Sequence, residues 1–264
     1  MRIGEPLTVS SLPIYQPFRE GLLSDSSDIE LVSAPLDELC ARMLSGDLDA
    51  SPISIIDYVR YQDRFDLLPG VSISSWGRSG STLLCCRGPL ASIEAIAVPE
   101  EFNWSHWSQW GSCLARWLLK SMYGTEPAVV MTDGELSELL LRYNAVLISG
   151  QAAFNVEEQS SDTIILDLGD AWWQATQTPL VHIVWAVSKQ VGDEDFERVS
   201  ELMGRAKERM EGCLPTAIQV GAEMAKVPPR QVDGYFRLCN FDLTPAHLKG
   251  IELLTQYLGQ AAIK

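Results

Sequence analysis

Short aliphatic segments alternate with amphipathic helical patterns along the whole chain, and this alternation limits the possible folds more than any other feature. The aliphatic segments cover residues 29–32, 53–56, 71–74, 81–86, 93–98, 145–149, 163–168 and 180–187. Short runs separated by helical patterns are typical of strands that helices cover on both faces of a sheet. The sequence therefore predicts an α/β protein with mixed sheets flanked by helices.

Five segments carry helical patterns with recognisable ends. Residues 36–44 show apolar side chains at three- and four-residue spacing and are followed by Gly46, and residues 108–122 form a second apolar stripe. Residues 132–135 form a capping box that predicts a third helix, since its hydroxyl and carboxylate would bond the first free N–H groups. Two more helices are expected over residues 196–210 and from Thr244-Pro245 onward.

The length of the chain allows more than one lobe. With 264 residues, of which 46% are hydrophobic, it can bury a core larger than one compact pair of layers. Neither a repeat nor a Pro/Ser-rich linker marks a boundary. We therefore expect two interleaved lobes, residues 1–95 with 190–264 and residues 96–189, joined by short crossings near residues 94–99 and 185–192.

The charge restricts the partners. A formal net charge of −15 repels nucleic acid and anionic lipid, so neither is expected as a partner. A small anionic ligand would have to be held by local backbone N–H groups, hydroxyls or a few arginines, because the global field opposes it.

Cysteine usage indicates neither a metal site nor a disulfide framework. The six cysteines include no C-x-x-C pair, and no histidines are paired at metal spacing. The chain shows no signal-peptide pattern and no apolar run of the ~18 residues that a membrane span needs. We therefore expect a cytoplasmic protein.

One segment joins an aliphatic strand, an acidic glycine turn, an aromatic pair and a second strand. It runs from Leu166-Asp167-Leu168-Gly169-Asp170-Ala171-Trp172-Trp173 through Thr176-Gln177-Thr178-Pro179 to Trp185. It resembles a motif of the menaquinone-biosynthesis family that includes chorismate dehydratase. Further matches follow in the family's order: Arg2-Ile3-Gly4 with Leu12-Pro13, Gly46-Asp47-Leu48-Asp49, and Leu68-Pro69-Gly70-Val71 before Ser81-Thr82-Leu83-Leu84.

This resemblance implies a periplasmic-binding-protein-like type II fold, in which two α/β lobes hold a ligand in the cleft between them. It implies an enzyme that removes water from chorismate to give 3-[(1-carboxyvinyl)oxy]benzoate, the first step of the futalosine route to menaquinone. No cofactor is implied, because aromatisation drives the reaction and the protein has to orient the substrate and place a base. A sister branch of the family acts later, on cyclised dehypoxanthine futalosine.

The matched pattern gives the candidate site residues. Ser10 and Ser81 are the candidate catalytic residues, and the candidate substrate-binding residues are Ser11, Ser54, Gly77, Arg78, Ser108, Thr176 and His182. Hydroxyls and backbone N–H groups would surround the substrate carboxylates, and Arg78 could clamp one of them. His182 could face the cleft, whereas His106 and His247 have structural positions. The structural alternatives are that such serines cap turns and that Arg78 is a surface residue.

The chain departs from the family pattern at several positions. Ser10 occupies the place of a usual asparagine, only Ser108 remains of a Ser-Arg-Thr-Ser turn, Trp110 replaces a small hydroxyl residue, and Gln151 replaces an acid. Two functions therefore stay open: a chorismate dehydratase-like lyase, or a catalytically silent or regulatory protein that binds a small carboxylate on the same scaffold. Both take a small anionic carboxylate as their partner.

Overall fold

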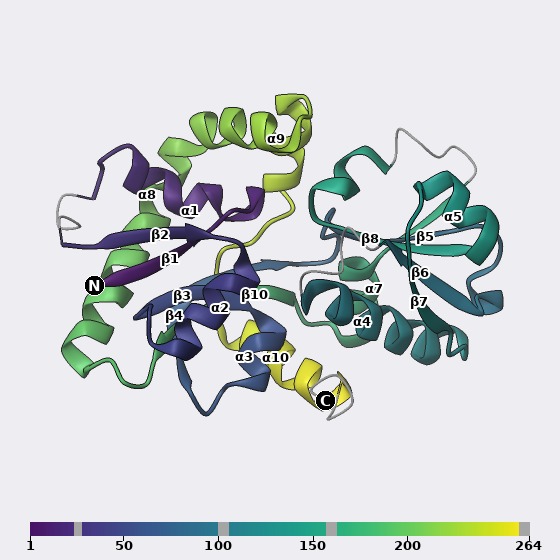
Figure 1. The fold of residues 1–264 in the computed structure, drawn as a ribbon, viewed down its shortest axis with the longest axis horizontal. Coiled ribbons are helices and arrows are strands. Elements are labelled where there is room, and N and C mark those ends of the chain that lie inside the picture. The colour runs from purple at the N-terminus through teal and green to yellow at the C-terminus, as the bar shows by residue number, and fades with distance from the viewer. Residues whose placement is uncertain (24–27, 100–105, 157–162, 259–264) are drawn as a thin grey trace. The chain divides into compact units, whose positions relative to one another are not determined.

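The computed structural model describes residues 1–23, 28–99, 106–156 and 163–258, and the chain forms two compact units. The first unit comprises Met1–Ser74 and Val181–Pro245, and the second comprises Ser75–Leu180 and the segment that begins at Ala246. Within the described residues, each unit contains one five-stranded mixed sheet flanked by helices (Figure 1). The predicted α/β class is confirmed.

The unit boundaries differ from the expected lobes of residues 1–95 with 190–264 and 96–189, and strand pairing is the reason. Strand β5 (Thr82–Cys86) pairs with β8 (Ala145–Ser149) and β9 (Ile164–Asp167) in the second sheet. Strand β10 (Leu180–Ser188) instead pairs with β3 (Ala50–Ser54) in the first. Helix α10 (Pro245–Leu258) belongs to the second unit from Ala246 onward. Aliphatic runs alone do not reveal which sheet a strand joins.

The sheet of the first unit has the order β2-β1-β3-β10-β4. Its remaining strands are β1 (Arg2–Pro6), β2 (Glu30–Ala34) and β4 (Phe65–Ser75). Strand β1 is parallel to β2 and β3, and β10 is antiparallel to β3. The turn η1 (Val9–Ser11) and helix α1 (Leu12–Arg19) follow β1 directly.

Within the described residues, four more helices belong to the first unit. Helix α1 packs along α8 (Asp193–Ala225), and α9 (Pro229–Phe236) packs on α8 as well. Helix α2 (Leu36–Ser45) and helix α3 (Ile55–Arg60) pack against β3 (Figure 1). The expected end of α2 is confirmed, because Gly46 follows it in the left-handed conformation with φ +83°.

The sheet of the second unit has the order β7-β6-β8-β5-β9. Strand β6 (Ala95–Pro99) is parallel to β7 (Ala128–Thr132) and β8, whereas β5 is antiparallel to both of its neighbours. Among the described residues of this unit, the helical elements are η2 (Leu90–Ser92), α4 (His106–Tyr123), α5 (Leu136–Tyr143), η4 (Gly150–Asn155), α7 (Leu168–Thr176) and α10.

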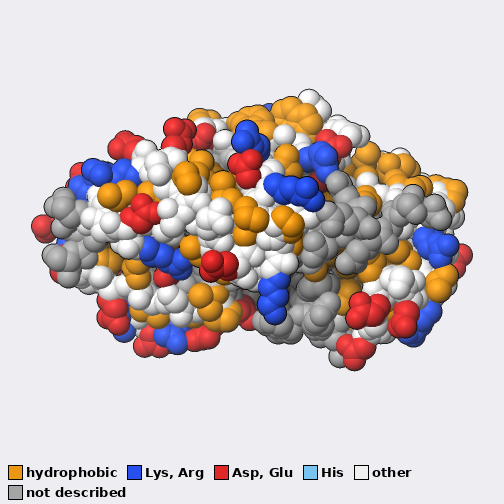
Figure 2. All heavy atoms as spheres, turned by 90° about the horizontal axis from the view of Figure 1, so that it is seen from above, with side chains coloured by type: hydrophobic (Ala, Val, Ile, Leu, Met, Phe, Trp, Pro, Cys, Tyr) orange, Lys and Arg blue, Asp and Glu red, His pale blue; other side chains and the backbone are white. Residues whose placement is uncertain are grey.

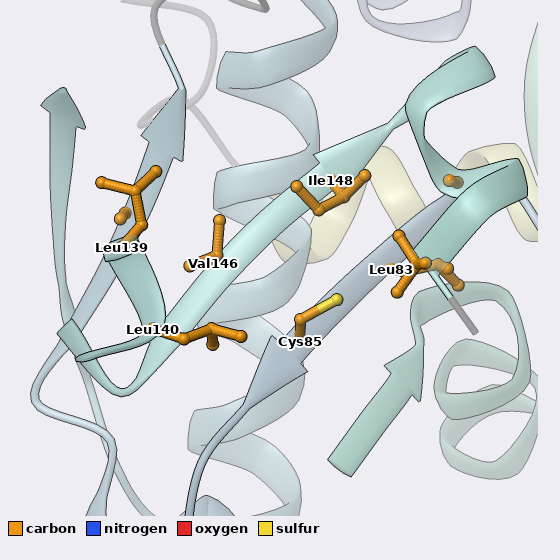
Figure 3. Packing of buried hydrophobic residues seen from close by; sticks show 9 residues of the cluster. Leu83, Cys85, Leu139, Leu140, Val146 and Ile148 are labelled. Atoms are coloured by element: carbon orange, nitrogen blue, oxygen red, sulfur yellow. The ribbon is translucent and has the colours of Figure 1, made fainter. Parts of the chain in front are cut away.

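The two faces of this second sheet are covered separately, as alternating side chains require. On one face, Leu83 and Cys85 of β5 and Val146 and Ile148 of β8 pack with Leu139 and Leu140 of α5 (Figure 3). On the other face, Leu147 meets α4, where a Cβ at Gly111 would lie 3.0 Å from its Cδ2. Both sets of side chains are buried.

Three local expectations need correction. Thr132 is the last residue of β7, paired with Pro99, and α5 has Glu135 as its N-cap without a side-chain hydrogen bond, so the predicted capping box is wrong. Strand β3 ends at Ser54, earlier than the expected strand over residues 53–56, because α3 begins at Ile55. Helix α8 extends from Asp193 to Ala225, well beyond the expected residues 196–210.

The surface carries charges of both signs. On the face drawn in Figure 2, basic side chains are interspersed with acidic ones, so the net charge of −15 is not gathered into one patch of that face. Of the helices in the described part of the chain, none has the length and apolar character to cross a membrane.

Candidate functional site

A glycine-rich loop, residues 75–81, joins the end of β4 to the start of β5 in the second unit. Gly77 has φ +88° and Gly80 has φ +62°, backbone conformations that side chains other than glycine rarely adopt. Three predicted site residues lie on this loop: Gly77, Arg78 and Ser81. The structure therefore brings these three together, and residues 75–81 are called the Ser81 loop below.

The buried carboxylate of Asp167 fixes the Ser81 loop. Asp167 Oδ1 and Oδ2 accept hydrogen bonds from Ser79 N at 2.9 and 3.0 Å, and Oδ2 accepts one from Gly80 N at 2.8 Å. The Ser79 hydroxyl donates to Oδ1 at 3.0 Å. Hydrogen bonds to a charged acceptor are roughly twice as strong as neutral ones. The loop is thus anchored at its centre by a residue 88 positions away in the sequence.

The same carboxylate caps helix α7. Gly169 N and Asp170 N donate to Asp167 Oδ1 at 2.8 and 3.3 Å, which satisfies two N–H groups of the first helical turn. Asp167 is 8% exposed. One side chain therefore joins the loop to the helix. The sequence pattern predicted no role for Asp167, although an acid directly between an aliphatic strand and a glycine-containing helix start is typical of an N-cap.

Gly169 allows the loop and the helix to approach closely. A Cβ at this position would lie 2.5 Å from the carbonyl oxygen of Gly77 and 2.9 Å from both Ser75 Oγ and Ser79 Cβ. A contact of 2.5 Å with a backbone atom can be relieved only by moving the loop or the helix. The glycine of the sequence motif is therefore required by this contact.

Ser81 lies at the end of the loop and is partly exposed. Its N–H points to Ser79 Oγ at 3.4 Å, and its carbonyl oxygen accepts a hydrogen bond from Gly150 N at 2.8 Å. Within the described part of the chain, the Ser81 hydroxyl has no hydrogen-bond partner. The backbone of Ser81 is thus held on both sides while its hydroxyl stays available to a ligand.

Two further side chains of the Ser81 loop are exposed. Arg78 is exposed, and Trp76 exposes 49% of its surface. The Trp76 ring lies 5.5 Å from the ring of Trp173 and 5.4 Å from the buried ring of His247, between centroids. The loop therefore carries an exposed arginine and an exposed tryptophan whose ring packs on Trp173 and His247.

The three predicted serines of the first unit lie at helix starts and turns. The Ser54 hydroxyl is the N-cap of α3, accepting from Asp57 N at 3.1 Å and donating to Asp57 Oδ2 at 2.6 Å. The buried Ser11 hydroxyl lies within hydrogen-bond distance of the carbonyls of Pro6 and Thr8. The Ser10 hydroxyl lies 3.2 Å from Thr8 Oγ1 and is less buried. Ser11 and Ser54 thus serve local structure.

The remaining predicted site residues are dispersed. Thr176 ends α7, and its hydroxyl donates to the carbonyl of Trp172 at 2.8 Å. His182 is buried in β10 of the first unit. The side chains of Ser108, His106 and Gln151 lie outside the described ones. Trp110, expected to place a bulky ring in the pocket, is 2% exposed and is part of the core of the second unit.

Across residues 1–23, 28–99, 106–156 and 163–258, no group of three or more His, Cys, Asp or Glu side chains is arranged to hold a metal ion.

Comparison with known proteins identifies the family. A family model described as menaquinone biosynthesis matches residues 1–260. The chain belongs to this family. Among curated proteins, the chorismate dehydratase of Thermus thermophilus is 25% identical over 272 residues, which cover 97% of this chain and 94% of the relative. Membership of the menaquinone-biosynthesis family, predicted from the sequence motifs, is thus confirmed.

Solved structures place this member of the menaquinone-biosynthesis family among periplasmic-binding-protein-like folds. Protein AF1704 of Archaeoglobus fulgidus matches with a TM-score of 0.67 at 15% identity, covering 97% of this chain and 95% of that one. The periplasmic aliphatic sulphonate binding protein SsuA of Escherichia coli matches with a TM-score of 0.68 at 14% identity, covering 98% and 85%. At these identities the likeness concerns the fold alone, and it confirms the predicted fold class.

Proposed function

We propose that this protein is a hydro-lyase that removes water from chorismate to give 3-[(1-carboxyvinyl)oxy]benzoate on the futalosine route to menaquinone. The family and the 25% identity to a chorismate dehydratase over 97% of the chain support the proposal. The single observation that carries it is the Ser81 hydroxyl. It is partly exposed, has no hydrogen-bond partner among the described residues, and lies on a loop anchored by Asp167.

The chemistry of the reaction fits what the Ser81 loop offers. The ring carbon that bears the enolpyruvyl ether loses its proton, and the electron pair of that C–H bond becomes a new ring double bond. The C–O bond of the neighbouring carbon breaks, and its hydroxyl leaves with a proton as water. Because the ring becomes aromatic, orienting the substrate and stabilising charge are the main tasks of the protein.

In this proposal Arg78 and Ser81 of the loop each have one task. The Arg78 guanidinium binds a chorismate carboxylate, for which its fork of donors is suited. The Ser81 hydroxyl donates a hydrogen bond to a substrate oxygen. This local arrangement offsets the repulsion that a protein of net charge −15 exerts on a dianion.

Incubation of the purified protein with chorismate, followed by chromatography with mass detection, tests the proposal. We expect a product lighter than chorismate by one water, and its formation to fall at least about 100-fold in Ser81→Ala. The matched control is Ser121→Ala, because Ser121 is an exposed serine on α4 of the same unit. Unchanged chorismate with the folded wild-type protein would contradict the proposal.

A second candidate function is binding of a small carboxylate without turnover, and Ser10 favours it. Ser10 stands where the resemblance leads us to expect an asparagine, and its hydroxyl already lies near Thr8 Oγ1, at 3.2 Å. In Ser10→Asn, product formation that appears or rises would indicate an intact but weakened site. An unchanged absence of product, with a thermal shift on adding chorismate, would favour the binding protein.

A further inference from the structure

We infer that Asp167 is the positioning residue of this site: its carboxylate holds the Ser81 loop in the conformation that presents Ser81 to the substrate. The inference rests on the proposed function as far as Ser81 is concerned, since the role of Asp167 is to place that hydroxyl. The placement of the loop itself can be measured independently of turnover.

A continuous chain of hydrogen bonds links Asp167 to Ser81 through Ser79. Asp167 Oδ1 accepts from the Ser79 hydroxyl at 3.0 Å, and Ser79 Oγ in turn accepts from Ser81 N at 3.4 Å and Thr82 N at 3.3 Å. Ser79 is 3% exposed, so water does not readily replace these contacts. Because the Ser79 hydroxyl donates its proton to Asp167, Ser79 Oγ acts as the acceptor for Ser81 N.

The negative charge matters here as well as the shape. Five donors converge on the Asp167 carboxylate: Ser79 N, Ser79 Oγ, Gly80 N, Gly169 N and Asp170 N. An asparagine of the same shape would replace one acceptor oxygen by an N–H₂ group that faces N–H donors. A buried donor left without an acceptor is destabilising, so the loop of an Asn variant would move away from its native position.

The structure also explains why the loop needs such an anchor. Gly77 and Gly80 have positive φ values, and glycine is the residue with the most conformational freedom to lose on folding. Without Asp167 this segment would have many accessible conformations. Displacing a reacting group by about 1 Å is enough to lower turnover about 100-fold, so anchoring the loop serves catalysis directly.

Asp167→Asn, compared with Asp49→Asn, tests the inference. Asp49 is a matched control because its carboxylate also accepts a backbone hydrogen bond, from Arg2 N at 2.7 Å, but belongs to the first unit, whereas the loop belongs to the second. In Asp167→Asn, we expect amide hydrogen exchange of a peptic peptide spanning residues 75–86 to be at least about 10-fold faster than in wild type. Asp49→Asn should leave that peptide unchanged.

Steady-state kinetics with chorismate form the second readout. In Asp167→Asn, we expect kcat per folded molecule to fall about 10- to 100-fold because the reacting group is misplaced, and KM to rise because Arg78 lies on the same loop. Loss of stability alone would lower only the apparent kcat per total protein, and it would leave kcat per folded molecule and KM unchanged. Ser79→Ala, a smaller change in the same chain of hydrogen bonds, should show the same pattern more weakly and covers the case in which Asp167→Asn does not fold.

Failure of the inference can be told apart from failure of the proposed function. If the peptide exchanged its amide hydrogens at the wild-type rate in both Asp167→Asn and Ser79→Ala, the inference would be overturned, whatever the activity. Faster exchange together with unchanged kcat in an active enzyme would overturn it too. If wild type does not convert chorismate, the proposed function fails, while faster exchange confined to the Asp167 and Ser79 variants would still support the anchoring role.

Discussion

Asp167 Oδ1 lies 3.0 Å from the hydroxyl oxygen of Ser79, although 88 positions separate the two residues in the sequence. This hydrogen bond connects the start of α7 with the Ser81 loop before β5. It therefore joins the sequence motif that begins at Leu166 to the glycine-rich loop. The motif therefore has a structural task. Its acid anchors the loop, and its glycine leaves room for the loop to come close.

Gly169→Ala should destabilise the protein. The added methyl group would lie 2.5 Å from the carbonyl oxygen of Gly77, so the loop or α7 has to shift, at a cost of about 1 to 3 kcal/mol. Urea unfolding measures this free energy. Gly204→Ala in α8 is the control, since nothing lies within 4 Å of its Cβ position and alanine favours a helix by up to about 1 kcal/mol. Equal stability of the two variants would contradict the close contact.

Ser54→Ala should lower the free energy of unfolding by about 1 kcal/mol, because α3 loses the cap that bonds Asp57 N at 3.1 Å. Ser54→Asn keeps a capping side chain and should retain most of this stability. Denaturant midpoints of the three proteins give the comparison. If Ser54→Ala were as stable as wild type, the cap would contribute nothing and a role of Ser54 at the substrate would gain weight.

Stability should fall steeply above pH 9 because of buried thiols. Burial raises the pKa of Cys40, Cys85 and Cys86 from 9.0 to about 12. Between these values the unfolded chain releases the thiol protons while the folded protein keeps them. Rising pH therefore favours unfolding by about 1.4 kcal/mol per pH unit and thiol.

The measurement is urea unfolding at about pH 8 and about pH 10. The double variant C85A/C86A should show a smaller loss between the two pH values, because two of the thiols with a raised pKa are gone. A loss as large as that of wild type would mean that other groups, such as the buried Tyr15, dominate. Burial raises the pKa of Tyr15 as well.

Tyr257→Ala should loosen the packing of α10 within the second unit. The Tyr257 ring stacks on Trp117 with 4.6 Å between centroids and 17° between planes, and it meets Trp172 edge-on at 6.4 Å. Since aromatic pairs add about 0.5 to 1.5 kcal/mol beyond area burial, we expect a lower melting temperature and altered tryptophan fluorescence. Tyr123→Ala removes a similarly exposed tyrosine that makes no such ring contact with the described residues, and it should change neither.

Much of the fold could be predicted from local patterns. The expected strand over residues 145–149 is β8, and the helix expected to end at Gly46 is α2. Periodicity succeeds there because it reports which side chains of a segment are buried. It failed at Thr132, where pairing with β6 makes the residue part of a strand instead of a cap.

The candidate site was predictable only in part. Gly77, Arg78 and Ser81 are close in the sequence, and one loop necessarily carries them. Ser11 and Ser54, selected by the same matching of patterns, bond their own turns, as serines in such places commonly do. Asp167 lies within the motif, but the residues around it in the sequence do not show that its carboxylate oxygens face the Ser81 loop.

The sequence by itself determined the α/β class, the family and the stretch of chain that carries the Ser81 loop, because hydrophobic periodicity and motif spacing are local properties. The tertiary structure alone decided that β5 joins the second sheet beside β9. That pairing brings the end of β9, and with it Asp167, next to Ser79 and Gly80. Contacts between distant residues depend on strand order, and strand order follows from the packing of the whole unit, which no single segment encodes.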